Sequence, residues 1–240
     1  MVRSDGGILM KCVWEHNGND TLLYSIDYIG AYTRGDNLEI ALGKMNSEIA
    51  SYCAWTGQTH AGVNEFEIVQ ERVSDLKICD ADSDVLFDTE TEPLTLDEYK
   101  SLKELVLKSA KDFYELYSVI PNKDISSLPE RKTFYGDVPR TAQQMYDHTK
   151  NVNTYYFGEI GIDADNDGTI LDCRIRAFDR LENTDGFLNN SVMEGSYGEF
   201  WTLRKVMRRF LWHDRIHAKA MYRMAIKTFG VFGTANIFKF

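Results

Sequence analysis

Apart from one helical segment that begins near Leu38, the hydrophobic periodicity of this chain changes from strand-like to helical near residue 90, and this change limits the possible folds more than any other feature. Before it, apolar and polar residues alternate, as in "NEFEIVQERV", with the two-residue period of a β-strand. After it, apolar residues recur every three or four positions, as in amphipathic helices. A length of 240 residues suits one or two domains. We therefore predict a small α+β domain over residues 1–90 and an all-α domain over residues 91–240.

A β-hairpin and one helix are the clearest elements of the first domain. Asn17 and Gly18 lie between two alternating segments, and Asn-Gly is the strongest short signal for a hairpin turn. Helical spacing begins near Leu38, with Asp36 as the expected N-cap and Glu39 three residues later. A strand follows, so the predicted order is strand, strand, helix, strand.

An acidic segment separates the two periodicities, and we interpret it as a linker with the domain boundary near residue 90. The first 90 residues contain 6 basic and 16 acidic side chains, whereas the remaining residues contain 21 of each. The net charge of −10 argues against general affinity for nucleic acid. No apolar stretch is long enough to span a membrane, and the N-terminal residues lack a signal-peptide pattern, so we expect a cytoplasmic protein. Scattered cysteines without a C-x-x-C pair are expected to be reduced.

Four helices are predicted after residue 93. The third, over residues 171–190, has the weakest pattern, and the fourth is expected to end at Gly230. Four helices of this kind favour a four-helix bundle. The first, second and fourth helices each begin with a capping-box pattern. The pairs are Thr95 with Glu98, Thr141 with Gln144 and Ser196 with Glu199.

Three histidines are candidate metal ligands. His213 and His217 lie four residues apart in the fourth helix, which places both imidazoles on one face. His148 lies in an apolar stripe of the second helix, between Met145 and Val152. A buried imidazole is either a core residue hydrogen-bonded to a neighbour or a ligand. Spacing leaves both interpretations open, but imidazoles buried side by side favour a cation between them. We predict that the three bind one divalent transition metal, zinc, nickel or iron.

Two other features are weaker candidates for metal ligands. His16 and His60 lie in the first domain and are expected to be solvated surface residues. Residues 163–168, "DADNDG", match the start of an EF-hand calcium loop, which requires glutamate at its twelfth position. That position is Arg174, so we expect a solvated acidic turn.

The second domain resembles the DinB/YfiT-like superfamily of bacterial metal-binding four-helix bundles. The resemblance rests on "TAQQMYDHTKNVNTYYFGEIG" and "FWTLRKVMRRFLWHDRIHAKAM", which look like the family's second and fourth helices. It implies that His148, His213 and His217 match the family's three metal ligands. Trp201, Arg208 and Arg209 also suit the pattern that precedes the histidine pair. The resemblance further implies a homodimer and a thiol-dependent transferase or isomerase that uses a low-molecular-weight thiol.

The first domain, over residues 8–73, resembles the HicB-like antitoxin domain. The similarity lies in "YSIDYIGAYTRGDNLEIALGKMNSEIASYCAW", with glycines at Gly30 and Gly35. No DNA-binding element accompanies it, which favours an interaction module over an antitoxin.

Two classes of function follow from these features. The first is a metal-dependent enzyme acting on a small molecule, in which Tyr155, Tyr156 or Glu159 supplies groups that support the ligands or transfer protons. Nothing in the sequence selects among these three residues. The second is a non-enzymic binding protein with a structural metal or none. An apolar fourth helix, with aromatic residues on several sides, also favours self-association, most simply as a dimer.

Overall fold

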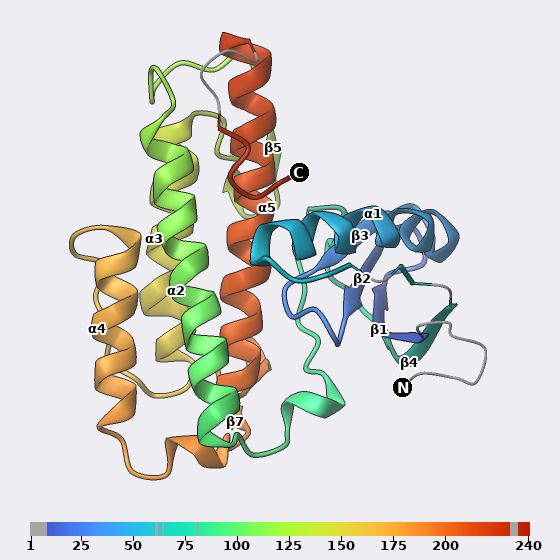
Figure 1. The fold of residues 1–240 in the computed structure, drawn as a ribbon, viewed down its shortest axis with the longest axis vertical. Helices are drawn as coiled ribbons and strands as arrows, with labels where there is room; N and C mark the ends of the chain where they lie inside the picture. The colour runs from blue at the N-terminus through green and yellow to red at the C-terminus, as the bar shows by residue number, and fades with distance from the viewer. Residues whose placement is uncertain (1–8, 61, 64, 81, 231–234) are drawn as a thin grey trace. The chain divides into compact units, whose positions relative to one another are not determined.

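The computed structural model describes residues 9–60, 62–63, 65–80, 82–230 and 235–240 (Figure 1). The chain divides into two compact units. The sheet unit extends to Glu90 and includes Lys239 and Phe240, and the helical unit is Thr91–Phe238. The division falls where the hydrophobic periodicity changes.

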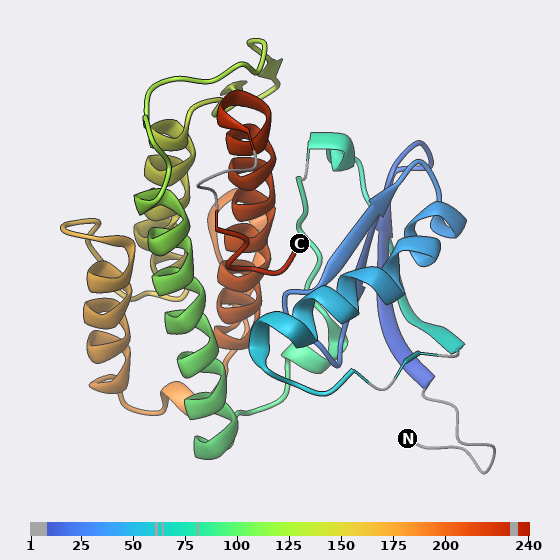
Figure 2. The ribbon, with the colours of Figure 1, turned by 45° about the horizontal axis from the view of Figure 1, so that its top comes forward.

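The sheet unit contains a four-stranded mixed sheet with strand order β3-β2-β1-β4. Strand β2 pairs antiparallel with β1 and β3, whereas β4 pairs parallel with β1. Helix α1 packs on β2 and β3 and covers one face of the sheet (Figure 2). The bounds are β1 Leu9–His16, β2 Thr21–Ser25, β3 Tyr32–Gly35, α1 Leu38–Thr56 and β4 Glu65–Val73.

The structure confirms the predicted hairpin between β1 and β2. The Asn17 side-chain oxygen accepts hydrogen bonds from the backbone N–H groups of Asn19 and Asp20, each at 3.0 Å. Gly18 has φ +85°, a left-handed conformation that glycine adopts without steric cost. This local hydrogen bonding sets the turn and so fixes the register of the first two strands.

Two details of the sheet unit differ from the sequence prediction. Strand β3 was not predicted, because four residues are too short to show a period. The N-cap of α1 is Asn37 rather than Asp36, since the Asn37 side chain accepts from Ile40 N at 3.0 Å. The helix therefore begins one residue later than the Asp36 pattern indicated.

The acidic segment that we interpreted as a linker packs onto the sheet unit. Glu15 on β1 is fully buried and accepts hydrogen bonds from Ser83 Oγ at 2.5 Å and Asp84 N at 3.1 Å. Gln70 on β4 donates to the Leu86 carbonyl at 2.9 Å. These bonds come from long-range partners, so periodicity could not reveal them.

Four long helices form most of the helical unit and run side by side (Figures 1 and 2). Helix α5 packs against α2 and α3, and helix α4 packs against the same two helices. Two short hairpins also belong to the unit, so the prediction is confirmed for its helices and not as an all-α domain. The helix bounds are α2 Leu96–Ser118, α3 Ala142–Gly158, α4 Ile170–Glu182 and α5 Leu203–Phe229. The hairpin strands are β5 Lys132–Thr133, β6 Gly136–Asp137, β7 Met193–Glu194 and β8 Phe200–Trp201.

Local capping sets the first residue of each of these helices. The capping boxes predicted at Thr95 and Thr141 are both present. Helix α4 has a third box at Thr169, in which Asp172 takes the place of the usual glutamate, and this replacement explains why the sequence pattern missed it. No described helix is long and apolar enough to cross a membrane.

Helix α5 begins later than predicted. Its N-cap is Thr202, whose side chain accepts from Lys205 N, whereas Ser196–Gly198 forms a separate 3-10 turn. Tyr197 has φ +62°, which interrupts a right-handed helix at that point. Instead of completing a capping box with Ser196, Glu199 pairs with Lys205 Nζ at 2.9 Å. The helix ends before Gly230, as predicted.

The aromatic residues of this region do not support the argument for a dimer. Of the four aromatic residues considered for self-association, Trp201, Phe210 and Trp212 are at most 2% exposed within a single chain, and Phe200 is 53% exposed. Their burial needs no second copy. The homodimer therefore stays a prediction that rests on the family resemblance.

Candidate metal centre

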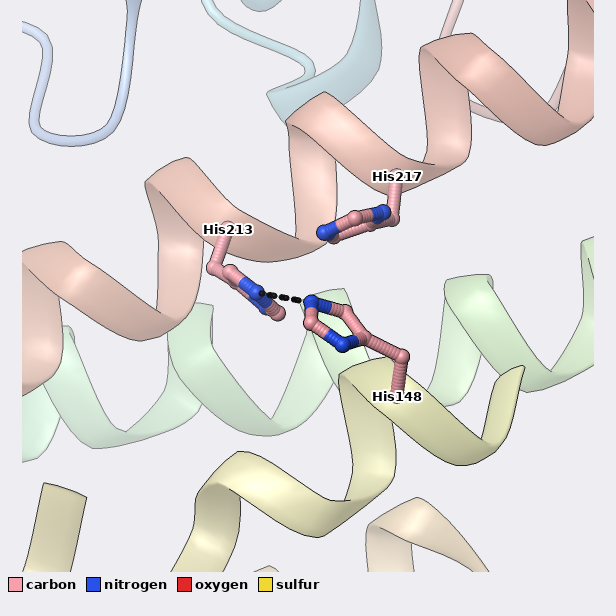
Figure 3. A group of neighbouring side chains, drawn as sticks. All are labelled: His148, His213 and His217. Carbon is pink, nitrogen blue, oxygen red and sulfur yellow. Dashed lines mark hydrogen bonds between the residues drawn. The ribbon is translucent and has the colours of Figure 1, made fainter. Parts of the chain in front are cut away.

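His148, His213 and His217 come together between helices α3 and α5 (Figure 3). Each offers one ring nitrogen, and these nitrogens all lie within 4.8 Å of one another. Figure 3 shows the two imidazoles of α5 and the imidazole of α3 pointing toward a common space. Within the described residues this is the one group of three or more His, Cys, Asp or Glu side chains that could hold a metal ion.

The helical periodicity of α3 and α5 explains this convergence. The four-residue spacing of the α5 histidines puts them one turn apart on the face that packs against α3. Met145 and Phe210, which belong to the same apolar stripes, are buried at 2% and 0% exposure. His213 is buried, while His148 and His217 are partly exposed. The cluster therefore lies at the border of the core.

The distances suit a tetrahedral ion. The Nε2 atoms of His213 and His148 are 3.2 Å apart. Two nitrogen ligands at 2.0–2.1 Å from a tetrahedral zinc ion are separated by about 3.3 Å. The ring centroid of His217 lies 4.4 Å from that of His213 and 4.6 Å from that of His148. The 3.2 Å separation of the His213 and His148 nitrogens therefore matches two ligands of one ion, and the His217 ring lies beside both.

Burial keeps the three imidazoles neutral. Desolvation lowers the pKa of His148, and it lowers the pKa of His217 to about 3. The pKa of His213 falls well below its usual value, first through desolvation and then through repulsion by the other two histidines. The nearby charges of Arg209 and Arg174 act in the same direction. Neutral imidazole is the form that binds metal, so the electrostatics match the geometry.

The second ring nitrogen of His213 is not satisfied by the protein. Its Nδ1 is buried and has no hydrogen-bond partner. Metal-bound histidines usually donate this N–H to a carboxylate or carbonyl oxygen. Among the described residues, His213 Nδ1 has no such acceptor.

The structure distinguishes among the three residues proposed to support the centre. The Tyr156 ring meets the His213 ring edge-on, with centroids 6.0 Å apart. The Tyr155 ring instead meets the Trp201 ring, with centroids 5.8 Å apart. Glu159 accepts a 2.6 Å hydrogen bond from Ser196 N and so holds the loop between β7 and β8. Only Tyr156 touches a member of the triad.

Two of the three residues that suited the family pattern, Arg209 and Trp201, pack against Tyr156. The Arg209 guanidinium lies 5.5 Å from the Tyr156 ring and 5.6 Å from the Trp201 ring. Arg208 is also buried, at 2% exposure. These contacts surround the end of α5 that precedes the histidine pair.

Sequence reasoning missed a buried ion pair beside the triad. Arg174 of α4 and Asp214 of α5 are both 0% exposed and are joined by two hydrogen bonds of 2.6 and 2.8 Å. The sequence contained an indication of this pair. Asp214 is the single acidic residue between positions 200 and 240, and it lies in an apolar and basic helix. An isolated acid in such a segment indicates a buried partner.

The remaining candidates lie outside the cluster. The prediction that His16 is a solvated surface residue is wrong. Its ring stacks on the Trp14 ring with centroids 3.9 Å apart, and its Nε2 lies 2.9 Å from Glu71 Oε1. His60 is exposed, as predicted. All four cysteines are free thiols, as predicted, and three of them are buried.

The acidic turn at residues 163–168 is organised by arginines. Asp165 accepts hydrogen bonds from Arg176 and from Arg180, the latter at 3.1 Å. The bond from Arg176 is the main reason why the pKa of Asp165 falls to about 2. Asp165, the third position of the candidate calcium loop, thus fastens the turn to α4.

No family model, curated protein or solved structure matches this chain. The similarity to DinB/YfiT-like proteins and to HicB-like domains therefore rests on the quoted residues alone.

Proposed function

We propose that the helical unit is a metal-dependent enzyme with a divalent transition ion held by His148, His213 and His217. One observation carries the proposal: three imidazoles from two helices place their ligand nitrogens within 4.8 Å of one another, at a site that lowers the pKa of each. The nitrogen donor set suits zinc, nickel or iron.

Three neutral ligands leave at least one coordination position for water or substrate. An ion held in this way would lower the pKa of a bound thiol or water and supply a nucleophile at neutral pH. The resemblance to DinB/YfiT-like four-helix bundles favours a low-molecular-weight thiol as co-substrate and a transferase or isomerase reaction. Of the three residues considered as supporting groups, Tyr156 is the one whose ring packs against a ligand, His213.

Metal analysis of protein purified without a nickel column tests the first part of the proposal. We expect about one equivalent of zinc, nickel or iron per chain, and Co²⁺ added to the apoprotein should give the visible absorption of a nitrogen-rich site. His213→Ala should lose both signals. Wild-type protein that binds none of these ions at neutral pH would refute the metal centre.

Thiol binding tests the second part. A low-molecular-weight thiol added to the Co²⁺ protein should produce a sulfur-to-cobalt charge-transfer band, because the thiolate enters an open position. A thiol-transfer assay with electrophilic acceptors then tests catalysis. A Co²⁺ protein with neither a thiol-dependent band nor transfer activity would leave a structural metal site and contradict the enzyme.

A further inference from the structure

We propose that α4, which carries no metal ligand, aligns the two helices that do, and that Arg174 is a positioning residue of the metal centre. This inference rests on the proposed function, since it concerns the same triad. It assigns a role to the ion pair between Arg174 and Asp214 and to the hydrogen bonds between α4 and α3.

The contact between α4 and α5 is geometrically restrictive. Arg174 Nη1 donates to Asp214 Oδ2 at 2.6 Å, and Arg174 Nη2 donates to Asp214 Oδ1 at 2.8 Å. Two parallel bonds between planar groups fix an angle as well as a distance. Because Asp214 directly follows His213, this pair sets the rotation of α5 at the position of the ligand.

A second contact holds the same segment of α5 from the adjacent turn. The Arg174 guanidinium lies 4.2 Å from the centre of the Phe210 ring. Phe210 and Asp214 are one turn apart, so both point toward α4, and His213 lies between them in sequence. Arg174 thus contacts α5 on both sides of the ligand.

Helix α3 is fastened to α4 on both sides of its own ligand, His148. The backbone N–H of Ile170 donates to the Tyr146 hydroxyl at 3.0 Å. The side chain of Asn153 donates to the Cys173 carbonyl at 3.4 Å. Cys173 and Arg174 are consecutive, so one turn of α4 connects to both ligand-bearing helices.

Stability alone does not explain a fully buried ion pair. The desolvation of two charges offsets most of their attraction, and apolar residues of similar volume often stabilise a core as well or better. What the pair supplies, and apolar residues do not, is a single allowed orientation between α4 and α5. A metal centre needs such an orientation, since its ligand distances tolerate errors of only about 0.2 Å.

A small rotation shows how sensitive the centre is. Histidine Nε2 atoms lie roughly 6–7 Å from the axis of their helix, whose Cα radius is about 2.3 Å. Turning α5 by about 20° would then move the Nε2 atoms of His213 and His217 by roughly 2 Å relative to His148. That movement exceeds the tolerance of metal coordination about tenfold.

The test measures Co²⁺ affinity and the visible spectrum of the full-length protein, together with thermal unfolding by circular dichroism. In Arg174→Met/Asp214→Leu, apolar residues replace the pair and the melting temperature should stay near the wild-type value. We expect its Co²⁺ affinity to fall by about tenfold or more, with altered absorption bands, as when groups that orient ligands are lost. Arg174→Lys keeps the charge without the paired hydrogen bonds and should also lose several-fold in affinity.

The control is Lys103→Met, which removes the 2.6 Å ion pair between Lys103 of α2 and Glu182 of α4 and leaves the ligand helices untouched. Its Co²⁺ affinity should stay within about twofold of wild type. If the folded double variant keeps the wild-type Co²⁺ affinity and spectrum, Arg174 has no positioning role. If the double variant does not fold, wild-type Co²⁺ affinity and spectrum in Arg174→Lys would overturn the role in the same way. Wild-type protein that binds no Co²⁺ would instead refute the metal centre itself, and this inference with it.

Discussion

The Nε2 atoms of His148 and His213 lie 3.2 Å apart, although 65 residues separate these histidines along the chain. With both imidazoles neutral, this contact is a hydrogen bond from one Nε2 to the other. A metal ion would use the same two nitrogens once the donor imidazole carries its proton on Nδ1 instead of Nε2. The fold therefore brings the ligands together before any ion binds, and metal uptake should require little reorganisation.

His217→Ala should abolish most metal binding and preserve the helical fold. Removing one of three ligands should lower the affinity for Co²⁺ by at least about 100-fold, since each ligand bond is a large part of the binding free energy. His217 is partly exposed, so the loss of its packing should cost the fold little. Spectrophotometric titration gives the affinity and circular dichroism gives the helix content. His60→Ala, at an exposed position in the sheet unit, should match wild type in both.

Metal binding should persist to lower pH than free histidine allows. Solvated histidines, with an ordinary pKa of about 6.5, would lose affinity for a metal below roughly pH 6.5. Burial lowers the pKa of all three histidines, to about 3 for His217, so protons compete less with the ion. Co²⁺ titrations at pH 7.5, 6.5 and 5.5 should give nearly constant affinity. A steep decline that begins at pH 6.5 would show that the imidazoles titrate as solvated groups.

The stability of the metal-free protein should decrease on acidification. Each histidine of the triad has a lowered pKa and is neutral in the folded state, so it takes up a proton on unfolding once the pH is below about 6.5. The stabilisation is therefore complete above pH 6.5 and is lost as the pH falls toward the folded pKa, by up to about 1.4 kcal/mol per pH unit for each histidine. Urea unfolding of the helical unit at pH 7.0 and 5.5 measures the slope. His217→Ala should have a shallower slope, and an equal slope would contradict the assignment.

Glu15→Ala should release the acidic segment from the sheet unit. The substitution removes the buried acceptor of the Ser83 hydroxyl and the Asp84 N–H, which costs about 2 kcal/mol. Cleavage by trypsin after the exposed Lys77 should accelerate by about tenfold or more, since proteolysis follows local opening. Glu71→Ala is the matched control, because that carboxylate is 51% exposed. Equal cleavage rates in the two variants would argue against a role for Glu15 in holding the segment.

Gly195→Ala should destabilise the start of α5. A Cβ atom at this position would lie 1.7 Å from Glu159 Oε2 and 2.7 Å from Trp201 Cδ1. Relief requires movement of the carboxylate that binds Ser196 N, so we expect a loss of about 1–3 kcal/mol in thermal or urea unfolding. Gly158→Ala provides the contrast. A Cβ at that helical position meets no atom within 4 Å, so the substitution should be neutral or stabilising.

The sequence by itself determined the features that depend on neighbours a few residues away. The capping boxes at Thr95 and Thr141, the hairpin at Asn17 and the common face of His213 and His217 all follow from local geometry. The same local reasoning failed at Ser196, where the left-handed backbone of Tyr197 and the pairing of Glu199 with Lys205 replace a helix start. Lys205, which binds the Glu199 carboxylate, lies outside the four-residue capping pattern that starts at Ser196.

Only the tertiary structure decided how the ligand-bearing helices meet. Periodicity placed His148 on an inward face, but its distance from His213 depends on the rotation of α3 and α5 about their own axes. The pairing of Arg174 with Asp214 across 40 positions and the burial of Glu15 beneath Ser83 are equally non-local. A helical period fixes directions within one helix, whereas the relative rotation of two helices is set by side chains from distant segments that pack and hydrogen-bond together.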